Sequence, residues 1–288
     1  MVHIITDSAA DLEPREYEAL GVTCIPLRVA FGEREYQENV DLGKARFYEL
    51  LLGSDAFPKT SQASPAVLEE IFEGVKANGE EAVYITLSSA LSGTYQNACM
   101  IRDDVDYAGN LVFDSRNATG GQRMLVEYAC RLRDEGKNAA QIVAGLESIR
   151  DRIELYAVVN NLEYLHKGGR ISHAVYTLGN LAQIKPIIAV DTDGRVTLPG
   201  KVMGMRKGMD FLCKRLAARK PDGDYPLYVM YTNNRSVAET LVQRLAACGC
   251  EIPEERIIQV GAAIGAHVGP DACGLVYVGG VRWTRYGS

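Results

Sequence analysis

A strand, a hydroxyl-rich loop and a helix follow one another in Tyr84-Ile85-Thr86-Leu87-Ser88-Ser89-Ala90-Leu91-Ser92-Gly93-Thr94. The apolar run Ala82–Leu87 predicts the strand, and Thr94–Val105 predicts the helix. The serines and the glycine between them offer hydroxyls and a close backbone approach, which can hold an anion at the start of a helix. The alternative is an ordinary capped helix without a ligand. The segment therefore predicts one strand–loop–helix unit of an α/β sheet, with a candidate anion-binding loop.

An apolar strand that ends in a small hydroxylated residue occurs twice more, in Ile4-Ile5-Thr6-Asp7-Ser8-Ala9 and in Leu111-Val112-Phe113-Asp114-Ser115. The carboxyl ends of parallel strands lie on one edge of a sheet, and ligands bind in the crevice where the strand order reverses. Three such strand ends can therefore converge on one polar spot. For Ser8 and Ser115 an equally good interpretation is that they only cap the helices that follow.

Strand and helix patterns alternate over the first half of the chain. The expected strands are Val2–Thr6, Thr23–Phe31, Ala82–Leu87, Asn110–Asp114 and Glu154–Val159. The expected helices are Pro14–Leu20, Leu42–Leu52, Pro65–Lys76, Thr94–Val105, Gly120–Glu135 and Ala139–Arg152. Buried strands separated by helices predict a parallel sheet that is covered on both faces.

The second half mixes hairpins with helices. Asp193-Gly194 between Ile184–Val190 and Arg195–Leu198 is a strong hairpin signal. Helices follow at Arg206–Ala218 and Ser236–Ala247, with strands at Tyr225–Tyr231, Arg256–Val260 and Gly274–Val278. The 288 residues suggest two domains. We expect an α/β domain over residues 1–152 and an α+β domain over residues 153–288, packed closely because no linker composition separates them.

Composition excludes several classes of protein. Apolar residues make up 47% of the chain and charged residues 24%, which argues against disorder. A net charge of -6 argues against a general attraction to nucleic acid. No apolar run is long enough for a membrane helix, and the first residues lack a signal-peptide pattern. The 7 cysteines are scattered, without metal-type spacing, so we expect reduced thiols in a cytoplasmic protein and no metal site.

Two further motifs carry candidate ligand-binding residues. Gly261 to Pro270 is rich in glycine and alanine and predicts a turn that presents His267 to a ligand, although a lone histidine is more often structural. His166 to Ser172 contains paired glycines, which imply unusual backbone geometry. Its Arg170 can reach an anion or can only fix a domain interface. The hydroxyl-rich loop Lys59–Pro65 precedes a helix and suits a carboxylate or a phosphate.

Other segments are less informative about function. The chain has no phosphate-binding P-loop, no dinucleotide-binding glycine fingerprint and no nucleophile elbow. The segment from Arg195 to Lys220 is strongly basic, and its helix has one apolar face. This segment is either a helix with a solvated basic face or a docking surface for an acidic partner or a membrane.

Taken together, the motifs resemble those of the DegV family of fatty-acid-binding proteins. The resemblance runs from Ile4 to about Val278 and rests on seven motifs that occur in the family's order. These are Ile5-Thr6-Asp7-Ser8, Thr60-Ser61-Gln62, Leu91-Ser92-Gly93-Thr94, Phe113-Asp114-Ser115, Gly168-Gly169-Arg170-Ile171-Ser172, Lys185-Pro186-Ile187 and Gly265-Ala266-His267-Val268-Gly269-Pro270. Two positions depart from the pattern, because a proline is expected near Ala63 and a glycine at Asp271.

The resemblance implies a two-domain α/β fold with a long-chain fatty acid in a buried apolar tunnel. It implies that the carboxylate is held by Thr60 and Ser61, by Ser92 and by the Gly93 amide. It places His267 near the carboxyl group and Arg170 at the mouth of the site. Asp271 adds a potential negative charge near His267, which can alter the histidine pKa or a partner contact.

The resemblance also implies a role without catalysis and without a cofactor. In the family, a separate kinase subunit uses ATP to phosphorylate the bound fatty acid to an acyl phosphate, and the binding protein exchanges this product with the membrane. We therefore expect a fatty acid ligand, a kinase partner, transient membrane contact, no nucleic acid and a place in phospholipid metabolism.

Two other functions remain open from the residues alone. One is a stand-alone serine-dependent hydrolase that uses a loop serine with His267, although no acidic partner and no nucleophile elbow can be identified. The other is a sensor of a phosphosugar or a nucleotide at the same strand ends. The sequence leaves open the acyl chain length, the oligomeric state, and which of Thr60 and Ser61 contacts the carboxylate.

Overall fold

The computed structural model describes residues 1–179 and 183–280. The strands of the first half are β1 (Val2–Asp7), β2 (Val22–Ile25), β3 (Arg28–Phe31), β4 (Arg34–Gln37), β5 (Lys59–Ser61), β6 (Glu81–Thr86) and β7 (Asn110–Asp114). Its helices are η1 (Ser8–Ala10), α1 (Pro14–Leu20), α2 (Lys44–Gly53), α3 (Pro65–Ala77), α4 (Thr94–Val105), α5 (Thr119–Asp134) and α6 (Ala139–Arg150).

The second half contains the strands β8 (Ile153–Val158), β9 (Ile184–Val190), β10 (Val196–Met203), β11 (Leu227–Tyr231), β12 (Ile257–Gln259) and β13 (Cys273–Val278). Its helices are α7 (Glu163–Lys167), α8 (His173–Gly179), α9 (Gly204–Ala218), α10 (Arg235–Ala247), η2 (Glu254–Arg256) and α11 (Ala262–Val268).

Four parallel strands in the order β2-β1-β6-β7 form the sheet of the first half. On one face Phe72 of α3 and Ile101 of α4 pack in a core with Ile5. On the other face Leu125 of α5 and Leu146 of α6 pack in a second core. The prediction of a parallel sheet with helices on both faces is confirmed.

The prediction of a single strand over Thr23–Phe31 is wrong. The segment forms two strands, of which β2 pairs with β1, whereas β3 lies between β4 and β5 in a separate three-stranded antiparallel sheet. Pro26 separates the two strands, and a proline has no N–H to continue the hydrogen-bond ladder. The loop expected at Lys59–Pro65 is also partly wrong, because Lys59–Ser61 forms strand β5, which pairs with β3.

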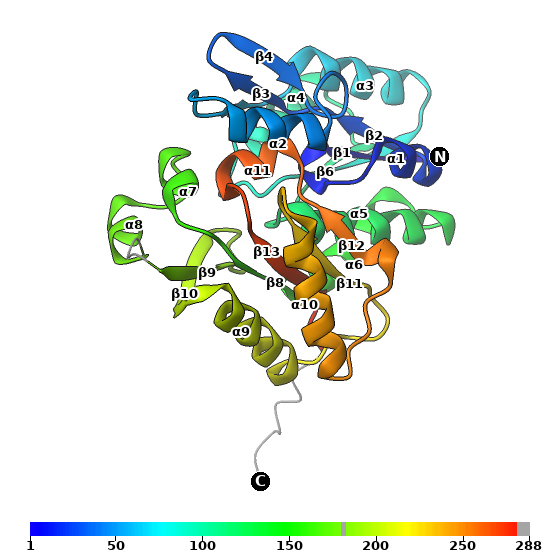
Figure 1. Cartoon of the computed structure of the whole chain (residues 1–288). Coiled ribbons are helices and arrows are strands. Elements are labelled where there is room, and N and C mark those ends of the chain that lie inside the picture. The colour runs from blue at the N-terminus through cyan, green and yellow to red at the C-terminus, as the bar shows by residue number, and fades with distance from the viewer. Residues whose placement is uncertain (180–182, 281–288) are drawn as a thin grey trace.

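Six strands in the order β10-β9-β8-β13-β11-β12 form the sheet of the second half. All neighbours are antiparallel except β11 and β12. The predicted hairpin joins β9 to β10 through Gly194, whose φ of 79° is a conformation that favours glycine. Leu212 of α9 and Leu241 of α10 pack against the face that carries Leu275. Figure 1 shows these two helices on the side of the sheet away from the first half.

Helix α5 connects the two halves, because it lies between their sheets (Figure 1). A Cβ atom added to Gly120 at its start would lie 2.6 Å from the Val276 side chain and 3.0 Å from the Met230 sulfur. Only a residue without a side chain allows this approach between helix and sheet. One large apolar core consequently contains residues of both halves, including Ile4 and Tyr228.

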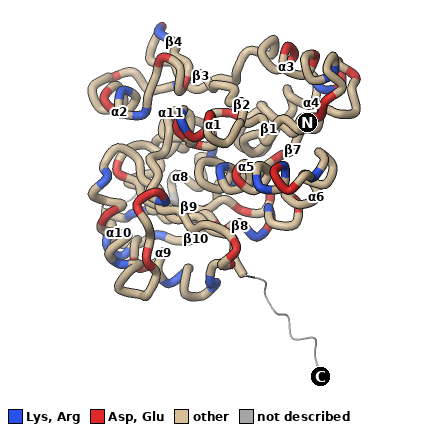
Figure 2. The backbone as a smooth tube through the Cα atoms, turned by 90° about the vertical axis from the view of Figure 1, so that its right-hand side faces the viewer, with Lys and Arg blue, Asp and Glu red and all other residues tan. Residues whose placement is uncertain are grey.

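Acidic and basic residues are interspersed over the molecule (Figure 2). Part of the basic segment 195–220 is paired within its own half, since Arg215 donates to the Tyr156 hydroxyl and Arg219 forms an ion pair with Glu154. Among the helices that the structure describes, none is both long enough and apolar enough to cross a membrane.

Candidate functional site

A cavity of about 450 Å³ lies between the two halves of the molecule. Most of its wall is apolar, and residues from both halves contribute to it. The first half supplies Leu27, Leu87, Leu91 and Ala118, and the six-stranded sheet and its loops supply Leu155, Ala157, Ile188, Val190 and Val196. A cavity of this size and lining suits an apolar ligand with only a few polar groups.

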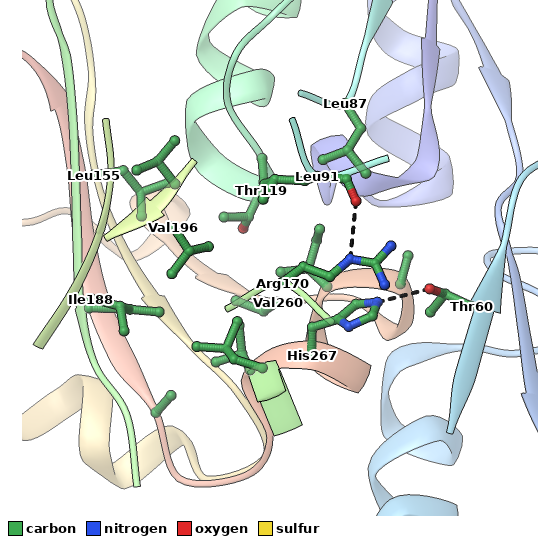
Figure 3. A pocket seen from close by; sticks show the side chains of 18 of the residues that line it. Thr60, Leu87, Leu91, Thr119, Leu155, Arg170, Ile188, Val196, Val260 and His267 are labelled. Carbon is green, nitrogen blue, oxygen red and sulfur yellow. Dashed lines mark hydrogen bonds between the residues drawn. The ribbon is translucent and has the colours of Figure 1, made fainter. Parts of the chain in front are cut away.

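The site residues expected from the sequence all line this cavity. They are Thr60, Ser61, Ser92, Gly93, Arg170 and His267, and Gln62 joins them. Figure 3 shows Thr60, Arg170 and His267 together near Leu91, whereas Leu155, Ile188 and Val196 lie on the opposite wall. The cavity therefore has one polar end and one apolar end. The role of these residues in holding a carboxylate stays a prediction.

Thr60 and His267 connect the two halves at the polar end. Thr60 belongs to β5 and His267 to α11, and Thr60 Oγ1 lies 2.8 Å from His267 Nε2 (Figure 3). The turn expected around His267 is wrong, because Ala262–Val268 is helical. Its glycines fit a helix: Gly265 packs against Phe47 and Tyr48 of α2, and Gly269 ends the helix with a φ of 78°.

His267 is neutral over the physiological range. Burial, with a further effect of the nearby Arg170 charge, lowers the pKa of His267 to about 3. Its buried Nδ1 has no hydrogen-bond partner among the described residues and faces Gly168, where an added Cβ would lie 2.1 Å away. Because orphaned buried N–H groups are rarer than orphaned acceptors, we assign the proton to Nε2, which then donates to Thr60 Oγ1. The Thr60 hydroxyl proton is left to donate to a ligand oxygen.

Arg170 is a half-buried cation beside the polar end of the cavity. Its Nε donates to Leu91 O at 3.0 Å, and Nη1 donates to Gly168 O. No carboxylate of the described residues forms an ion pair with it, and burial lowers its pKa. The turn before it contains Gly169, whose φ of 75° confirms the unusual backbone geometry expected of the paired glycines.

Ser92 and Gly93 form the entry to α4. Ser92 Oγ lies 2.8 Å from Thr94 Oγ1 and accepts the Thr94 N–H at 3.3 Å. A Cβ added to Gly93 would lie 2.4 Å from Gln62 Nε2, so the two hydroxyl-rich loops meet there. The first turn of a helix presents N–H groups without intrahelical partners, which favours an anion at this point.

Two buried carboxylates hold the start of α11. Asp11 Oδ1 accepts the Gly261 N–H at 2.9 Å, and Glu38 Oε1 accepts the N–H groups of Ala262 and Ala263. Burial raises the pKa of Asp11 to about 6 and that of Glu38 to about 7. Sequence reasoning missed both residues, because a single acid beside a turn carries no motif.

The strand-end serines do not converge on the cavity. Ser8 Oγ donates to Glu38 Oε2 at 2.7 Å, Ser88 Oγ to Gly194 O at 2.8 Å and Ser115 Oγ to Asn117 O at 3.0 Å. The hypothesis of three converging strand ends is therefore wrong for these serines, which satisfy buried protein groups instead.

Some cavity residues had no prediction from the sequence. They are Gln62, Thr119, Tyr231 and Thr232. Gln62 belongs to the motif Thr60-Ser61-Gln62, which was the available signal, but no role was expected of it. Thr119 has a φ of 48°, a conformation that no sequence pattern predicts.

The two departures from the DegV pattern have different consequences. Asp271 has a φ of 59°, so it occupies a conformation that favours the glycine expected there. Its backbone N–H donates to Asn233 Oδ1 at 2.6 Å. The pKa of His267 is lowered by burial and by Arg170, and Asp271 is not among the groups that shift it. Ala63 packs against the core between the first sheet and its helices.

The fold and the cavity define an α/β protein whose ligand site lies between a parallel and a mixed sheet. A family model described as DegV, an uncharacterised protein family, matches residues 1–279, and the chain belongs to this family. A DegV domain-containing protein of Caldanaerobacter subterraneus subsp. tengcongensis is 33% identical over 279 residues, covering 96% of this chain and 98% of the relative. One of Halalkalibacterium halodurans is 34% identical over 277 residues, with 95% and 97% covered.

Solved structures share the fold over nearly the whole chain. A DegV family protein of Thermus thermophilus, described by its fatty acid binding, has a TM-score of 0.86 at 28% identity and covers 96% of this chain and 99% of its own. DegV of Bacillus subtilis, described as a fatty acid binding protein, has a TM-score of 0.83 at 27% identity, with 97% and 99% covered. The fold expected from the sequence, a parallel-sheet part followed by a mixed part, is confirmed.

Proposed function

We propose that this chain binds one long-chain fatty acid in the cavity, with the tail along the apolar wall and the carboxylate at the polar end. The observation that carries the proposal is Arg170, a half-buried cation without a carboxylate partner among the described residues, beside hydroxyls at one end of an apolar cavity. Thr60, Ser92 and the Gly93 amide hold the carboxylate, His267 orients Thr60, and the exposed Ser61 beside them contributes a weaker contact. Fatty acid binding by the structurally similar proteins of Thermus thermophilus and Bacillus subtilis supports this ligand.

The two ends of the cavity contribute to affinity in different ways. Burying one CH₂ group contributes about 0.8 kcal/mol, so a long tail contributes on the order of 10 kcal/mol before the cost of immobilisation. A hydrogen bond to a charged acceptor contributes about 1.5–3 kcal/mol. The tail therefore dominates affinity, and the polar end fixes the orientation of the ligand.

We further propose that the chain presents its fatty acid to a separate ATP-dependent kinase subunit in the cytoplasm, and exchanges the acyl phosphate product by transient membrane contact. Ser61 at the polar end is exposed, which supports access to the carboxylate from outside. The chain itself needs no catalytic group, cofactor or metal for this role. A hydrolase is not favoured, because His267 hydrogen bonds to Thr60 and no carboxylate of the described residues bonds to its ring.

The domain boundaries remain a proposal as well. We place them at residues 1–152 and 153–288, because Ile153 is the first residue of β8 and begins the six-stranded sheet. The second unit completes the lipid site by supplying Arg170, His267 and the apolar wall.

Mass spectrometry of an organic extract of the purified chain tests the ligand. We expect close to one long-chain fatty acid per chain, and the extract reveals the preferred length. An empty extract, followed by failure to bind added palmitic acid, contradicts the proposal.

Head-group recognition is tested with Arg170→Met. The wild type should bind palmitic acid more tightly than its methyl ester. The ratio of these two affinities should fall about 10- to 100-fold in Arg170→Met. Lys59→Met is the matched control, because Lys59 is exposed on the same strand as Thr60. An equal preference in all three proteins overturns the assignment of the polar end.

The kinase partnership is tested separately. The purified chain loaded with palmitic acid should not consume ATP alone, and should do so only after addition of a fatty acid kinase subunit from the same cells. ATP consumption by the chain alone, or none in the mixture, contradicts the accessory role while leaving fatty acid binding intact.

A further inference from the structure

Two of the four histidines of the chain face each other on α7 and α8, outside the lining of the cavity. His166 lies in the last turn of α7 and His173 is the first residue of α8, and His166 Nε2 lies 3.3 Å from His173 Nδ1. The chain reverses between them through Gly168 and Gly169, the latter in a left-handed conformation. The turn brings together two side chains that no metal-binding spacing in the sequence connects.

The two rings are oriented by their neighbours and are accessible. Tyr176, one turn further along α8, stacks on His166 with ring centroids 4.4 Å apart and an interplanar angle of 13°. The ring centroids of His166 and His173 are 5.2 Å apart. His173 is exposed and His166 is half-buried, so a solute can reach the nitrogens from solvent.

We propose that His166 and His173 form a two-histidine site for a divalent transition-metal ion of the zinc, nickel or copper type. Two imidazole nitrogens bound to one tetrahedral ion at about 2.05 Å lie about 3.3 Å apart, and their ring centroids lie about 5.2 Å apart. Both separations match those between His166 and His173. Imidazole is a preferred ligand of these ions, and each ring can present an unprotonated nitrogen when neutral.

The remaining coordination positions belong to water. The described residues contain no group of three or more His, Cys, Asp or Glu side chains that could hold a metal ion. The site therefore has only two protein ligands and open positions. Such a site exchanges its ion more readily than a closed structural site with four protein ligands.

Metal binding would stiffen one wall of the cavity. Leu165 of α7 lines the cavity, and Val175 and Tyr176 of α8 pack in the same apolar cluster as Ile188. An ion between His166 and His173 ties α7 to α8 beside this wall. This second part of the inference rests on the proposed function, since it concerns exchange of the ligand.

Calorimetric titration of the tag-free chain with Zn²⁺ tests the site. We expect one Zn²⁺ per chain, bound at least about tenfold more weakly after His166→Ala and after His173→Ala. His3→Ala is the matched control and should keep the wild-type affinity, because His3 pairs with Glu80 at a distant surface position. Circular dichroism checks that each variant is folded.

Three outcomes overturn the site: no uptake of Zn²⁺ by the wild type, a loss in only one of the two histidine variants, or an equal loss in His3→Ala. In each case the 3.3 Å contact is a hydrogen bond only. The second part is measured as the rate at which bound palmitic acid leaves the chain with and without Zn²⁺, and an unchanged rate overturns it. The Zn²⁺ titration needs no lipid, so failure of fatty acid binding leaves its result interpretable.

Discussion

At its apolar end the cavity is walled by neighbouring strands of one sheet, whereas at its polar end short segments from distant parts of the chain meet. Ile188 and Val196 lie on the paired strands β9 and β10, and Leu155 lies on β8 next to them. The polar end instead requires β5, the entry to α4, the turn after α7, and α11. A sheet positions its side chains through regular register, but the polar end depends on individual contacts such as the one between Thr60 and His267.

The difference between the two ends of the cavity predicts which substitutions weaken fatty acid binding at each end. At the apolar end, Val196→Asp should weaken binding of palmitic acid at least about 100-fold, because the bound tail would displace water from the ionised carboxylate and offer it no hydrogen-bond partner. Val196 is half-buried, so the fold should tolerate the change. Equilibrium binding of a labelled fatty acid measures the effect.

Val196→Leu is the matched control for this change, and it should alter the affinity less than about tenfold. If Val196→Asp bound palmitic acid as tightly as Val196→Leu, the tail would not lie along this wall.

The stability of the polar end depends on Glu38, through the start of α11. Burial raises its pKa from 4.5 to about 7, so between these values the folded chain holds a proton that the unfolded chain releases. Glu38 therefore contributes stability at low pH that is lost as the pH rises through 7. Glu38→Gln mimics the protonated form at every pH. The free energy of unfolding of this variant minus that of wild type should therefore be larger at pH 8 than at pH 5, by on the order of 2 kcal/mol.

Urea unfolding at both pH values measures this difference. Asp134→Asn is a matched control, because Asp134 is exposed and lies at the end of α5. If the difference in free energy of unfolding between wild type and Glu38→Gln were the same at both pH values, Glu38 would not hold a proton in the folded chain.

At the polar end, the structure separates the two candidate hydroxyls on β5. Thr60 is half-buried and contacts His267, whereas Ser61 is exposed. Thr60→Val should weaken fatty acid binding about tenfold, because it removes one hydrogen bond to a charged group without changing the side-chain shape. Ser61→Ala should change the affinity by less than about threefold. The reverse order in a binding titration would make Ser61 the carboxylate ligand.

The sequence predicted an element correctly where the residues that define its ends lie within the element or next to it. Helix α1 was predicted over Pro14–Leu20 because Pro14 begins it and Gly21 ends it in a left-handed conformation. Helix α4 and strand β7 likewise have the predicted bounds. The bounds of these elements can be predicted because the residues that determine them lie within a few positions of their ends.

The parts that sequence reasoning missed depend on distant contacts. Gly265 looked like part of a turn, but it lies in helix α11, where its lack of a side chain lets the helix pack closely against Phe47 and Tyr48 of α2. Glu38 acquires its role only when Gly261 to Ala263 come to it from the other end of the chain. The site residues were expected individually, but their division into a polar and an apolar end required the folded structure.

The smallest expected effect concerns His267 itself. Burial and the Arg170 charge lower its pKa to about 3, so its ring should stay neutral between pH 5 and 8, where an exposed histidine titrates. In NMR spectra its ring signal should not move across this range. Free imidazole added to the same sample serves as the internal reference.

The neutral state of the His267 ring determines how the polar end can bind a carboxylate. A protonated His267 would donate from both nitrogens and would place a second cation beside Arg170, so that the carboxylate could bind through charge alone. A neutral ring can only orient the Thr60 hydroxyl, so affinity should depend on Thr60 equally at pH 6 and pH 8. A His267 signal that titrates near its ordinary pKa, together with a Thr60→Val effect that fades at pH 6, would show that the polar end binds the carboxylate by charge and not by an oriented hydroxyl.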